Sequence, residues 1–507
     1  MENFLTILEV SQKQAYIFAS KKLKENAARS RDIEWVTSSD FFADVVEWYK
    51  EEDNLVYAGG GHTVLQFASK EKAESFAKAV TEAVLRKYPA LEMFVKTISY
   101  DPAVSPGDNL KKLSKALEQK KARRTSSFRM ADFGLEAAEK EASRSAGEER
   151  PKPPDGYHFP AEFEELAKAL PEDEKTRADN FIAVIHIDGN AMGKRVEDIY
   201  KKNTENWENC RASLKNFSEG IQEDFEAAFR DTVDEVIRVL RPGAVLPIRP
   251  VILAGDDVCF VTAGAIGLEC ARVFLEKLSQ RSNSQQQDRP YAACAGVALV
   301  HTKYPFHRAY ELAEELCSSA KRYGASLDAE GSVSAMDWHI EFGQLKDSLS
   351  QLREDYRTED GCRLELRPVA VKVPEPPEDE QQPFRKVQQP PTERTYDYFR
   401  TLCSGMKREQ AKVARSKIKE LRTALKQGEV EGRFFLQEKQ IGDLLYLPLD
   451  AALPLKKELS LEGWRQELNN KEAFRAFLEK GEEVRRCLFF DAIELFDHFK
   501  AFEEVHR

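Results

Sequence analysis

Three aspartates in two short stretches are the residues of this chain that point most directly to chemistry. Asp256 and Asp257 lie side by side in RPVILAGDDVCFV, among residues typical of buried strands, and Asp188 ends the strand-like stretch FIAVIHID. A buried carboxylate without a partner is strongly unfavourable. Three carboxylates close together also raise one another's pKa. A divalent cation removes both problems, and oxygen ligands suit Mg²⁺ or Mn²⁺.

Two such ions, about 3.5–4 Å apart, activate an attacking hydroxyl and stabilise a leaving phosphate group. The three acids are therefore candidate catalytic residues and candidate ligands of a two-metal site. A plainer interpretation of Asp256-Asp257 is turn chemistry, because aspartate bonds to its own backbone and tolerates turn dihedrals. The strand-end Asp188 and the order of the surrounding elements favour the metal site.

Small residues next to these acids are candidate nucleotide-binding groups. DGNAMGK directly follows the first strand, and a glycine precedes the Asp pair. Backbone N–H groups at such turns approach phosphates closely. These candidates are Gly189, Asn190, Gly193 and Gly255.

A lysine near the end of a predicted helix is a further candidate. Lys321 lies in CSSAKRY. If this helix packs beside the AGDD hairpin, the ammonium group reaches a triphosphate as a point charge. Otherwise Lys321 is a solvated surface lysine.

The elements that must position these residues lie in 181–345, which we call the second unit. Their order is strand, helix, two strands, helix, strand, which is the split βαβ (ferredoxin-like) plan of an α+β fold. We expect an antiparallel sheet with helices on one face. The first strand and the central hairpin are neighbours in this plan, so Asp188 comes within reach of Asp256 and Asp257.

Residues 1–100, the first unit, repeat this order of elements. YAGGGHTVLQF aligns with LAGDDVCFV, so Gly59, Gly60 and Gly61 stand where the second unit has Gly-Asp-Asp. ILEVSQ aligns with IHIDGN, which sets Ser11 opposite Asp188. The first unit thus has the shape without the acids, and duplication is favoured over chance similarity.

Three further regions complete the predicted organisation. Residues 101–180 form a charged insert of helix and loop. Residues 346–395 contain a strand-like piece, RLELRPVAVKV, and a Pro- and Gln-rich linker. Residues 396–507 form a C-terminal helical domain. Its apolar stripe is Ala411, Ala414, Ile418, Leu421 and Leu425.

Composition narrows the class of protein. The net charge of −11 argues against indiscriminate binding of nucleic acid. The eight cysteines contain no CxxC spacing, so we expect reduced core residues and no zinc site. No apolar run is long enough to span a membrane, and no signal peptide is evident, so we expect a cytoplasmic protein.

Three segments together resemble the palm domain of the large subunit of type III CRISPR effector complexes: HIDGNAMGK, AGDDVCF and CAGVALVHTKYPFHRAYELAEELCSSAK. That family has a GGDD hairpin and is related to the polymerase and nucleotide-cyclase palms. Its members carry a degenerate first palm and a catalytic second palm. EVSQKQAYIFASKKLKENAARSRDI is similar to the start of the first palm. The resemblance covers about residues 1–100 and 181–345, plus LRPVAV.

The resemblance implies an activity and roles for the candidate residues. ATP is condensed into cyclic oligoadenylates with release of pyrophosphate, with Mg²⁺ or Mn²⁺ as cofactor. Asp188 and Asp256 would ligate metal, Asp257 would assist the 3′-hydroxyl or the metals, and Lys321 would hold triphosphate. The first palm would offer a second nucleotide pocket near Ser11 and the three glycines at 59–61.

The chain also departs from the family pattern. Ala254 replaces the first glycine of GGDD, and Asn190 replaces the usual second acid after the strand. The family's HD nuclease domain and its cysteine zinc finger are not found, so we expect a compact relative without DNA cleavage.

The resemblance implies other effector subunits and guide or target RNA as partners, although membership of an RNA-guided complex stays open. A basic C-terminal segment is a candidate RNA contact. A solvated helix face is an equally good interpretation. Its basic residues are Lys407, Arg408, Lys412, Arg415, Lys417, Lys419, Arg422 and Lys426.

Two other functions fit the same residues. One is a nucleotide- or RNA-binding scaffold whose acids hold metal without turnover. The other is a cyclic dinucleotide synthase that uses GTP or mixed nucleotides. The sequence leaves open the base, the product's ring size, the trigger and the oligomeric state, because base selection depends on hydrogen bonds within the pocket.

Overall fold

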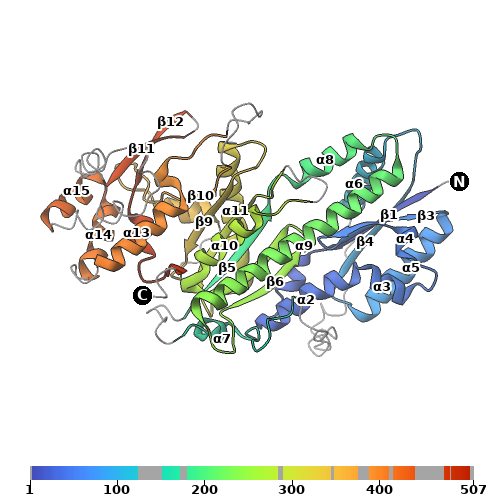
Figure 1. The fold of residues 1–507 in the computed structure, drawn as a ribbon, viewed down its shortest axis with the longest axis horizontal. Helices are drawn as coiled ribbons and strands as arrows, with labels where there is room; N and C mark the ends of the chain where they lie inside the picture. The colour runs from blue at the N-terminus through green and yellow to red at the C-terminus, as the bar shows by residue number, and fades with distance from the viewer. Residues whose placement is uncertain are drawn as a thin grey trace.

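The computed structural model describes residues 3–123, 151–171, 180–283, 289–343, 348–374, 387–409, 415–439, 473–479 and 481–502. The first unit, the second unit and the C-terminal region follow one another along the long axis of the molecule (Figure 1). Both units have the βαββαβ order, so the predicted α+β fold with two ferredoxin-like units is confirmed. The predicted division into domains stays a prediction.

The first unit contains a four-stranded antiparallel sheet in the order β2-β3-β1-β4. Its strands are β1 (Phe4–Ser11), β2 (Leu55–Gly59), β3 (His62–Phe67) and β4 (Glu92–Ser99). Its helices are α1 (Lys13–Ile17), α2 (Leu23–Val36), α3 (Ser39–Val45), α4 (Glu51–Asn54) and α5 (Lys70–Lys87). Side chains such as Leu8, Leu65 and Phe76 share one core under α2, α3 and α5.

The second unit is built on a six-stranded sheet in the order β10-β9-β8-β5-β7-β6. Its strands are β5 (Phe181–Gly189), β6 (Ile248–Ala254), β7 (Asp257–Ala263), β8 (Ala293–His301), β9 (Ser334–Ile340) and β10 (Val369–Lys372). Its helices are α8 (Met192–Lys202), α9 (Trp207–Leu240), α10 (Gly267–Ser279), α11 (Phe306–Leu327) and α12 (Leu349–Glu354). The strand β5 lies between β7 and β8, as the split βαβ plan requires.

Helices cover both faces of this sheet, so the expectation of helices on one face only is wrong. On β5, Ile185 and Ile187 belong to the core under α9 and α10, whereas Val184 belongs to the core under α11 and the first unit. Burial on both faces explains why β5 is almost continuously apolar and does not alternate. His186 and Asp188 extend the series that starts at Val184, and they therefore face α11.

The edge of the sheet differs from the sequence prediction in two ways. The strand β9, which the sequence pattern did not predict, pairs in parallel with β8. The predicted strand at 363–373 is shorter, because only Val369–Lys372 forms β10. Segment 363–368 instead lies beside the C-terminal hairpin, where Arg363 N–H donates to Arg485 O at 2.8 Å.

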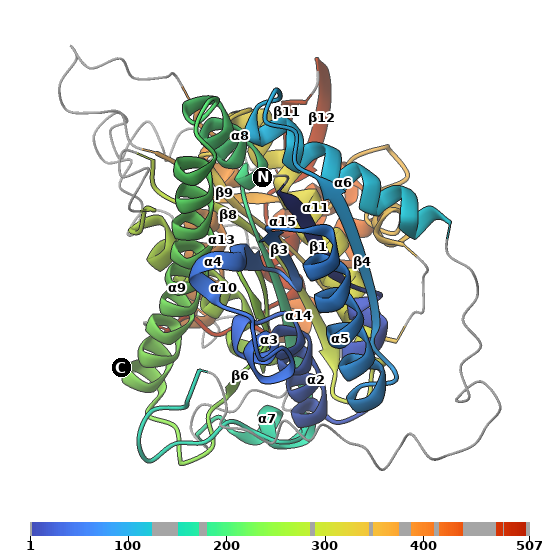
Figure 2. The ribbon, with the colours of Figure 1, turned by 90° about the vertical axis from the view of Figure 1, so that its right-hand side faces the viewer.

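The long helix α9 contacts both units (Figures 1 and 2). Asn206 caps its N-terminus by accepting a hydrogen bond from Asn209 N–H at 3.0 Å. Its C-cap, Arg241, has a left-handed backbone with φ 47°, and Pro242 follows. This end agrees with the predicted stop at Arg-Pro-Gly.

The predicted insert contains α6 (Pro106–Ala122) and α7 (Phe163–Lys168). Two parts of the insert, 124–150 and 172–179, lie outside the described residues. The linker at 375–386 also lies outside them. The C-terminal region is mainly helical where it is described, with α13 (Tyr396–Glu409), α14 (Arg415–Gln427), α15 (Glu429–Glu438) and α19 (Phe490–Glu494).

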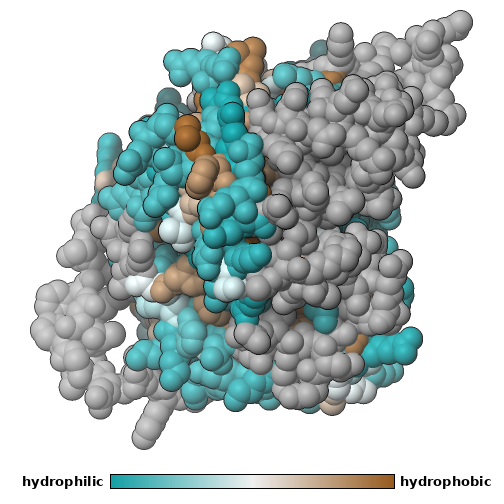
Figure 3. Space-filling view, turned by 90° about the vertical axis from the view of Figure 1, so that its left-hand side faces the viewer, coloured by the Kyte–Doolittle hydropathy of each residue, from teal (hydrophilic) through white to brown (hydrophobic). Residues whose placement is uncertain are grey.

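The C-terminal region also contains an antiparallel hairpin that the sequence pattern did not predict. Its strands are β11 (Phe474–Glu479) and β12 (Glu482–Cys487). Of the predicted apolar stripe, Leu421 and Leu425 are buried, Ile418 packs against the core, and residues 411 and 414 lie outside the described residues. The described part of this end is mostly hydrophilic, with scattered hydrophobic side chains (Figure 3).

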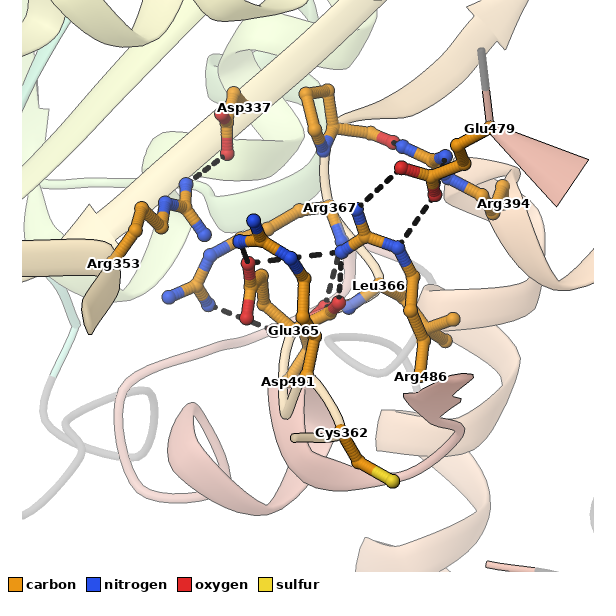
Figure 4. Close-up of polar contacts among 12 residues, drawn as sticks. Asp337, Arg353, Cys362, Glu365, Leu366, Arg367, Arg394, Glu479, Arg486 and Asp491 are labelled. Carbon is orange, nitrogen blue, oxygen red and sulfur yellow. Dashed lines mark hydrogen bonds and ion pairs between the residues drawn. The ribbon is translucent and has the colours of Figure 1, made fainter. Parts of the chain in front are cut away.

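An ion network with little exposure joins α19 to the second unit. Arg367 Nη1 lies 2.9 Å from Asp491 Oδ1 and 3.0 Å from Glu494 Oε2 (the Arg367–Asp491 pair is shown in Figure 4). The side chains of these three residues are 0%, 4% and 2% exposed. Charges taken out of water at such a junction must stay paired, so the network fixes how α19 lies on the segment before β10.

All eight cysteines are buried and free, in agreement with the predicted reduced core residues. Among the described helices, none combines the length and the apolar character that crossing a membrane requires.

Candidate active site

The structure brings the three predicted acids together at one end of the central strands. Asp188 near the end of β5 lies directly opposite Asp257 at the start of β7. Gly255 and Asp256 form the turn between β6 and β7, and Gly255 has a φ of 69°, which favours glycine. The juxtaposition follows from the split βαβ plan, because β5 and the hairpin are hydrogen-bonded neighbours. The catalytic roles of the acids stay a prediction.

Lys321 reaches this site from α11. Its Nζ lies 2.5 Å from Asp188 Oδ2 and donates to Gly189 O at 3.1 Å. The prediction that its helix packs beside the hairpin end of the sheet therefore agrees with the geometry. In this arrangement the ammonium group neutralises Asp188, and its role in binding triphosphate stays a prediction.

Asp257 lies beside His186, whose ring packs against Tyr310. Asp257 Oδ1 lies 3.6 Å from His186 Nδ1, and neither atom has a hydrogen-bond partner among the described residues. The His186 ring packs at 5.3 Å from the Tyr310 ring, as expected of a packing histidine. The Asp257 side chain is 50% exposed, so one carboxylate oxygen is shielded while the rest of the group is open to a ligand.

The carboxylates of the site carry more negative charge than the neighbouring lysines neutralise. Burial, and then repulsion by Asp188, raises the pKa of Asp256 to about 6 and that of Asp257 to about 7. Within the described residues, no three His, Cys, Asp or Glu side chains are grouped as ligands of one ion. In charge and donor type the residues nevertheless fit a hard divalent cation, because Asp257 Oδ1 is shielded and unpartnered.

These pKa shifts predict how the stability of the metal-free protein depends on pH. The folded values lie above the ordinary value of 3.8, so the native state binds more protons than the unfolded chain between about pH 4 and pH 7. Stability is therefore lost as pH rises through this window. We expect D256N/D257N to gain roughly 1–2 kcal/mol over the parent between pH 4 and pH 8, with the half-exposure of Asp257 discounted.

The measurement is urea unfolding of both proteins in EDTA at pH 4, 6 and 8. A stability difference that does not change with pH would contradict the assigned pKa shifts.

Gly189 lies in close contact with the acidic turn. A Cβ added there would lie 2.5 Å from Met192 Cε and 2.8 Å from Asp256 Cβ. Its N–H donates to Asp256 O at 3.2 Å. A Cβ added at Gly193, in the first turn of α8, would meet open space, with nothing within 4 Å. The first glycine is thus required by packing, and the second is not.

G189A is expected to destabilise the protein by about 1–3 kcal/mol, because the added methyl group must displace the turn that carries Asp256. G193A is the matched control, and its stability should be unchanged or up to about 1 kcal/mol higher because alanine favours helix. Thermal unfolding of both variants tests the pair. Equal effects would argue against the close packing of Gly189.

Two of the other predicted nucleotide-binding groups are already bonded within the protein. Asn190 donates through its backbone N–H to Ala292 O at 2.8 Å and through Nδ2 to Val333 O at 2.9 Å. Gly255 N–H donates to Gln222 Oε1 at 2.6 Å. In this arrangement these N–H groups fix the shape of the site and are not directed at a ligand.

The glycine turn of the first unit faces the acidic turn of the second. A Cβ added at Gly60 would lie 4.0 Å from Ala254 O. Gly60 and Gly61 have φ values of 59° and 75°, and Gly59 ends β2 beside α9. Ser11 ends β1, next to this turn, since Val10 N–H donates to Gly61 O at 3.1 Å. The predicted second pocket thus borders the acids.

Sequence reasoning missed two residues at this junction. Lys13 Nζ donates to Gly60 O, and the Lys13 charge lowers the pKa of Asp257 while burial lowers the pKa of Lys13 itself. The alignment of Ser11 with Asp188 pointed to this stretch, so the same alignment could have identified Lys13, two residues after Ser11, as a candidate. Gln222 holds the acidic turn from α9, and nothing in an amphipathic helix pattern distinguishes it.

The basic C-terminal segment is partly engaged within the protein. Arg415 pairs with Asp497, and Arg422 Nη2 lies 3.5 Å from Glu494 Oε1. Lys412 lies outside the described residues. An RNA contact by this segment stays a prediction.

Comparisons with known proteins agree with the fold. Residues 181–327 match the family described as Cas10/Cmr2, second palm domain. Csm1 of T. onnurineus is 15% identical, with a TM-score of 0.55 over 93% of this chain and 67% of that chain. The matched chain of a Csm1–Csm4 cassette in complex with one ATP is 14% identical, with a TM-score of 0.55 over 98% of this chain and 70% of that chain. The comparison with curated proteins finds no match.

The chain spans about half the length of some of these proteins. In the apo Csm1–Csm4 cassette it covers 53% of the matched chain, with 64% of its own length aligned, 14% identity and a TM-score of 0.46. At such identities, the likeness at a TM-score of 0.55 establishes the fold alone.

Proposed function

Because the chain is Cas10-like and carries the Cas10/Cmr2 second palm domain, we propose that it is a metal-dependent nucleotidyltransferase of a type III CRISPR-like defence system. It condenses ATP into cyclic oligoadenylates. The observation that carries this proposal is the position of Asp188 opposite Asp257, beside the Gly-Asp-Asp turn and Lys321. The solved Csm1–Csm4 cassettes in complex with pppApA, AMPPNP and one ATP support it as structures of related fold.

The proposed reaction joins two nucleotides held between the units. The 3′-hydroxyl oxygen of one ATP attacks the α-phosphorus of the next, a P–O bond forms, and the bond to pyrophosphate breaks. Asp188, Asp256 and Asp257 would hold Mg²⁺ or Mn²⁺, which supplies activation of the hydroxyl and charge stabilisation of the leaving group.

The protein's own cations take the remaining charge. Lys321 pairs with Asp188 in this structure. Once a metal ion neutralised the Asp188 carboxylate, the Lys321 ammonium group would be released to bind the triphosphate. The turn of the first unit, Gly59–Gly61, would bring the second nucleotide to the acids, with Lys13 beside it. Orientation of both nucleotides by fixed backbone is the main contribution of such a junction to the rate.

Partners and location follow from the same proposal. Csm1 chains of related fold are solved with Csm4, and we propose that this chain also associates with effector subunits and with guide or target RNA. We also propose that it acts in the cytoplasm.

The test is mass spectrometry of the full chain incubated with ATP and Mg²⁺ or Mn²⁺, with and without candidate partner RNA. The matched variants are D188N and D234N, the latter an exposed aspartate on α9 outside the site. Cyclic or linear oligoadenylates made by the parent and by D234N, but not by D188N, would support the proposal. Products made only from GTP or mixed nucleotides would favour the dinucleotide synthase.

A scaffold without turnover is the second candidate, and one observation favours it. Asp188 is occupied by Lys321, and no three-ligand group exists among the described residues. Binding of ATP without any product from the four nucleotides, partner RNA included, would select this function.

A further inference from the structure

A polar pocket of about 670 Å³ lies between the second unit and the C-terminal hairpin, and none of the three acids lines it. It is bordered by α11, α12, segment 363–368 and β12. Leu349 and Pro368 are its only lining residues without a charge or a hydroxyl group. Five arginines from four segments meet in it: Arg322, Arg353, Arg363, Arg367 and Arg486.

Of the four carboxylates that line this pocket, Asp337 and Glu365 are paired with arginine, which argues against a metal site at them. The other two, on α11, accept hydrogen bonds: Glu314 Oε1 from Gln14 Nε2 at 3.2 Å and Glu315 Oε2 from Leu349 N–H at 2.6 Å. Arg353 Nη2 lies 2.6 Å from Asp337 Oδ1. Glu365 Oε1 lies 3.2 Å from Arg363 Nη1 and 3.6 Å from Arg486 Nη1. In Figure 4, Arg353, Arg367 and Arg486 approach from different directions, with Asp337 and Glu365 among them.

Several buried polar atoms of this cluster nevertheless lack a hydrogen-bond partner within the described part of the chain. The Arg367 side chain is wholly buried, and its Nε and Nη2 donate to no described residue, while Nη1 serves Asp491 and Glu494. Arg353 Nη1 is a further unpartnered donor, and Asp337 Oδ2 and Glu365 Oε2 are unpartnered acceptors. Buried groups of this kind are normally bonded to protein, water or a ligand.

The unpartnered atoms define the chemistry of a ligand. It must offer several acceptor oxygens to guanidinium groups and at least one donor to a carboxylate. Phosphate oxygens match the fork of arginine. Hydroxyl or amino groups of a nucleoside supply the donors, and a pocket of this size holds a small molecule.

We propose that this pocket is a nucleotide-binding site, separate from the candidate active site. Arg322, exposed at the pocket without a salt bridge to any described residue, and Arg353 contact the phosphates, and the carboxylate side accepts from the nucleoside. The same helix α11 carries Lys321 to Asp188 and lines the pocket with Ser318 and Arg322. A nucleotide in the pocket therefore contacts the element that holds the active-site lysine.

The experiment is photo-crosslinking of the full chain with 8-azido-ATP, followed by peptide mass spectrometry. Peptides from residues 349–368 border the pocket and not the acids, so their label reports the pocket. We expect R322A and R322A/R353Q to lose at least tenfold of this label. K321A and the matched control R308A, an exposed arginine of α11 paired with Glu311, should keep it.

The single variant R322A changes an exposed side chain, so its result stands even if R322A/R353Q fails to fold. ATP and AMP should compete for the label, pyrophosphate less well, and adenosine not at all. Label on 349–368 that persists in R322A and R322A/R353Q, or that disappears in K321A, would overturn the proposal. Adenosine or pyrophosphate competing as well as ATP would also overturn it. The readout is binding, so it holds or fails independently of oligoadenylate synthesis.

Discussion

Replacement of Asp256 and Asp257 by asparagine is expected to lower ATP condensation by about 10³-fold or more, because metal-held charge stabilisation is worth several kcal/mol. The same change should not destabilise the fold at pH 8. Burial and repulsion by Asp188 already raise the pKa of both carboxyls, so neutral side chains of equal size remove an unfavourable charge. Loss of function together with equal or higher stability is the pattern of residues retained for chemistry.

Mass spectrometry of the products and urea unfolding of the same preparations measure both effects. D234N is the control, since it removes one exposed negative charge from α9 away from the turn. If D256N/D257N made product at the parental rate, the acids would be turn residues only, as their plainer interpretation holds.

Removal of the buried guanidinium group of Arg367 is expected to produce the largest loss of stability. R367M leaves Asp491 and Glu494 buried without their cation, and the loss of one partner of a buried pair costs about 3–5 kcal/mol. Asp491 Oδ2 also accepts from Leu366 N–H at 2.9 Å and from Arg367 N–H at 3.1 Å. Loosening this junction should free α19, which limited proteolysis of the C-terminal region would detect.

Urea unfolding distinguishes charge from packing. The triple variant R367M/D491N/E494Q removes all three of these buried charges, so it should regain much of the lost stability. R308M, on the exposed face of α11, is the control for loss of a surface arginine and should change stability by less than about 1 kcal/mol. A triple variant no more stable than R367M would show that methionine fails to fill the space around Tyr356 and Trp338.

The sequence predicted the elements around the acids because the signal there is local. β-branched residues in FIAVIHID and VILAGDDVCFV make strands, and the short turn pairs β6 with β7. The pairing of β5 with β7 is long-range and followed from the split βαβ plan. The position of Lys321 followed from a helix after β8 that returns across the sheet. The resemblance added the second palm, which the family match bears out.

What the sequence did not reveal depends on distant partners. The strand β9 contains Asp337 and His339, which break an apolar pattern, and they are buried only because Arg353 and Tyr356 cover them. The hairpin β11–β12 is rich in charged residues that pair with other segments, as Arg486 does with Glu365. Local propensity contains no information on such pairings.

The helix α9 sets the interval between the two turns at the candidate site. Ser218 Oγ donates to Ala58 O at 2.5 Å, and Gln222 Nε2 donates to Leu253 O at 3.1 Å. These two side chains are four residues apart, which is about 6 Å along a helix axis. The distance between the glycine turn of the first unit and the acidic turn of the second is thus set by the rise of α9. One residue inserted between Ser218 and Gln222 would rotate Gln222 about the helix axis by about 100°.

Both of these contacts go to carbonyl oxygens of the backbone, which every amino-acid sequence supplies. The two contacts therefore depend on the backbone of each turn and not on the side chains of Ala58 and Leu253. The spacing of the two turns is in this way independent of the side chains at these two positions.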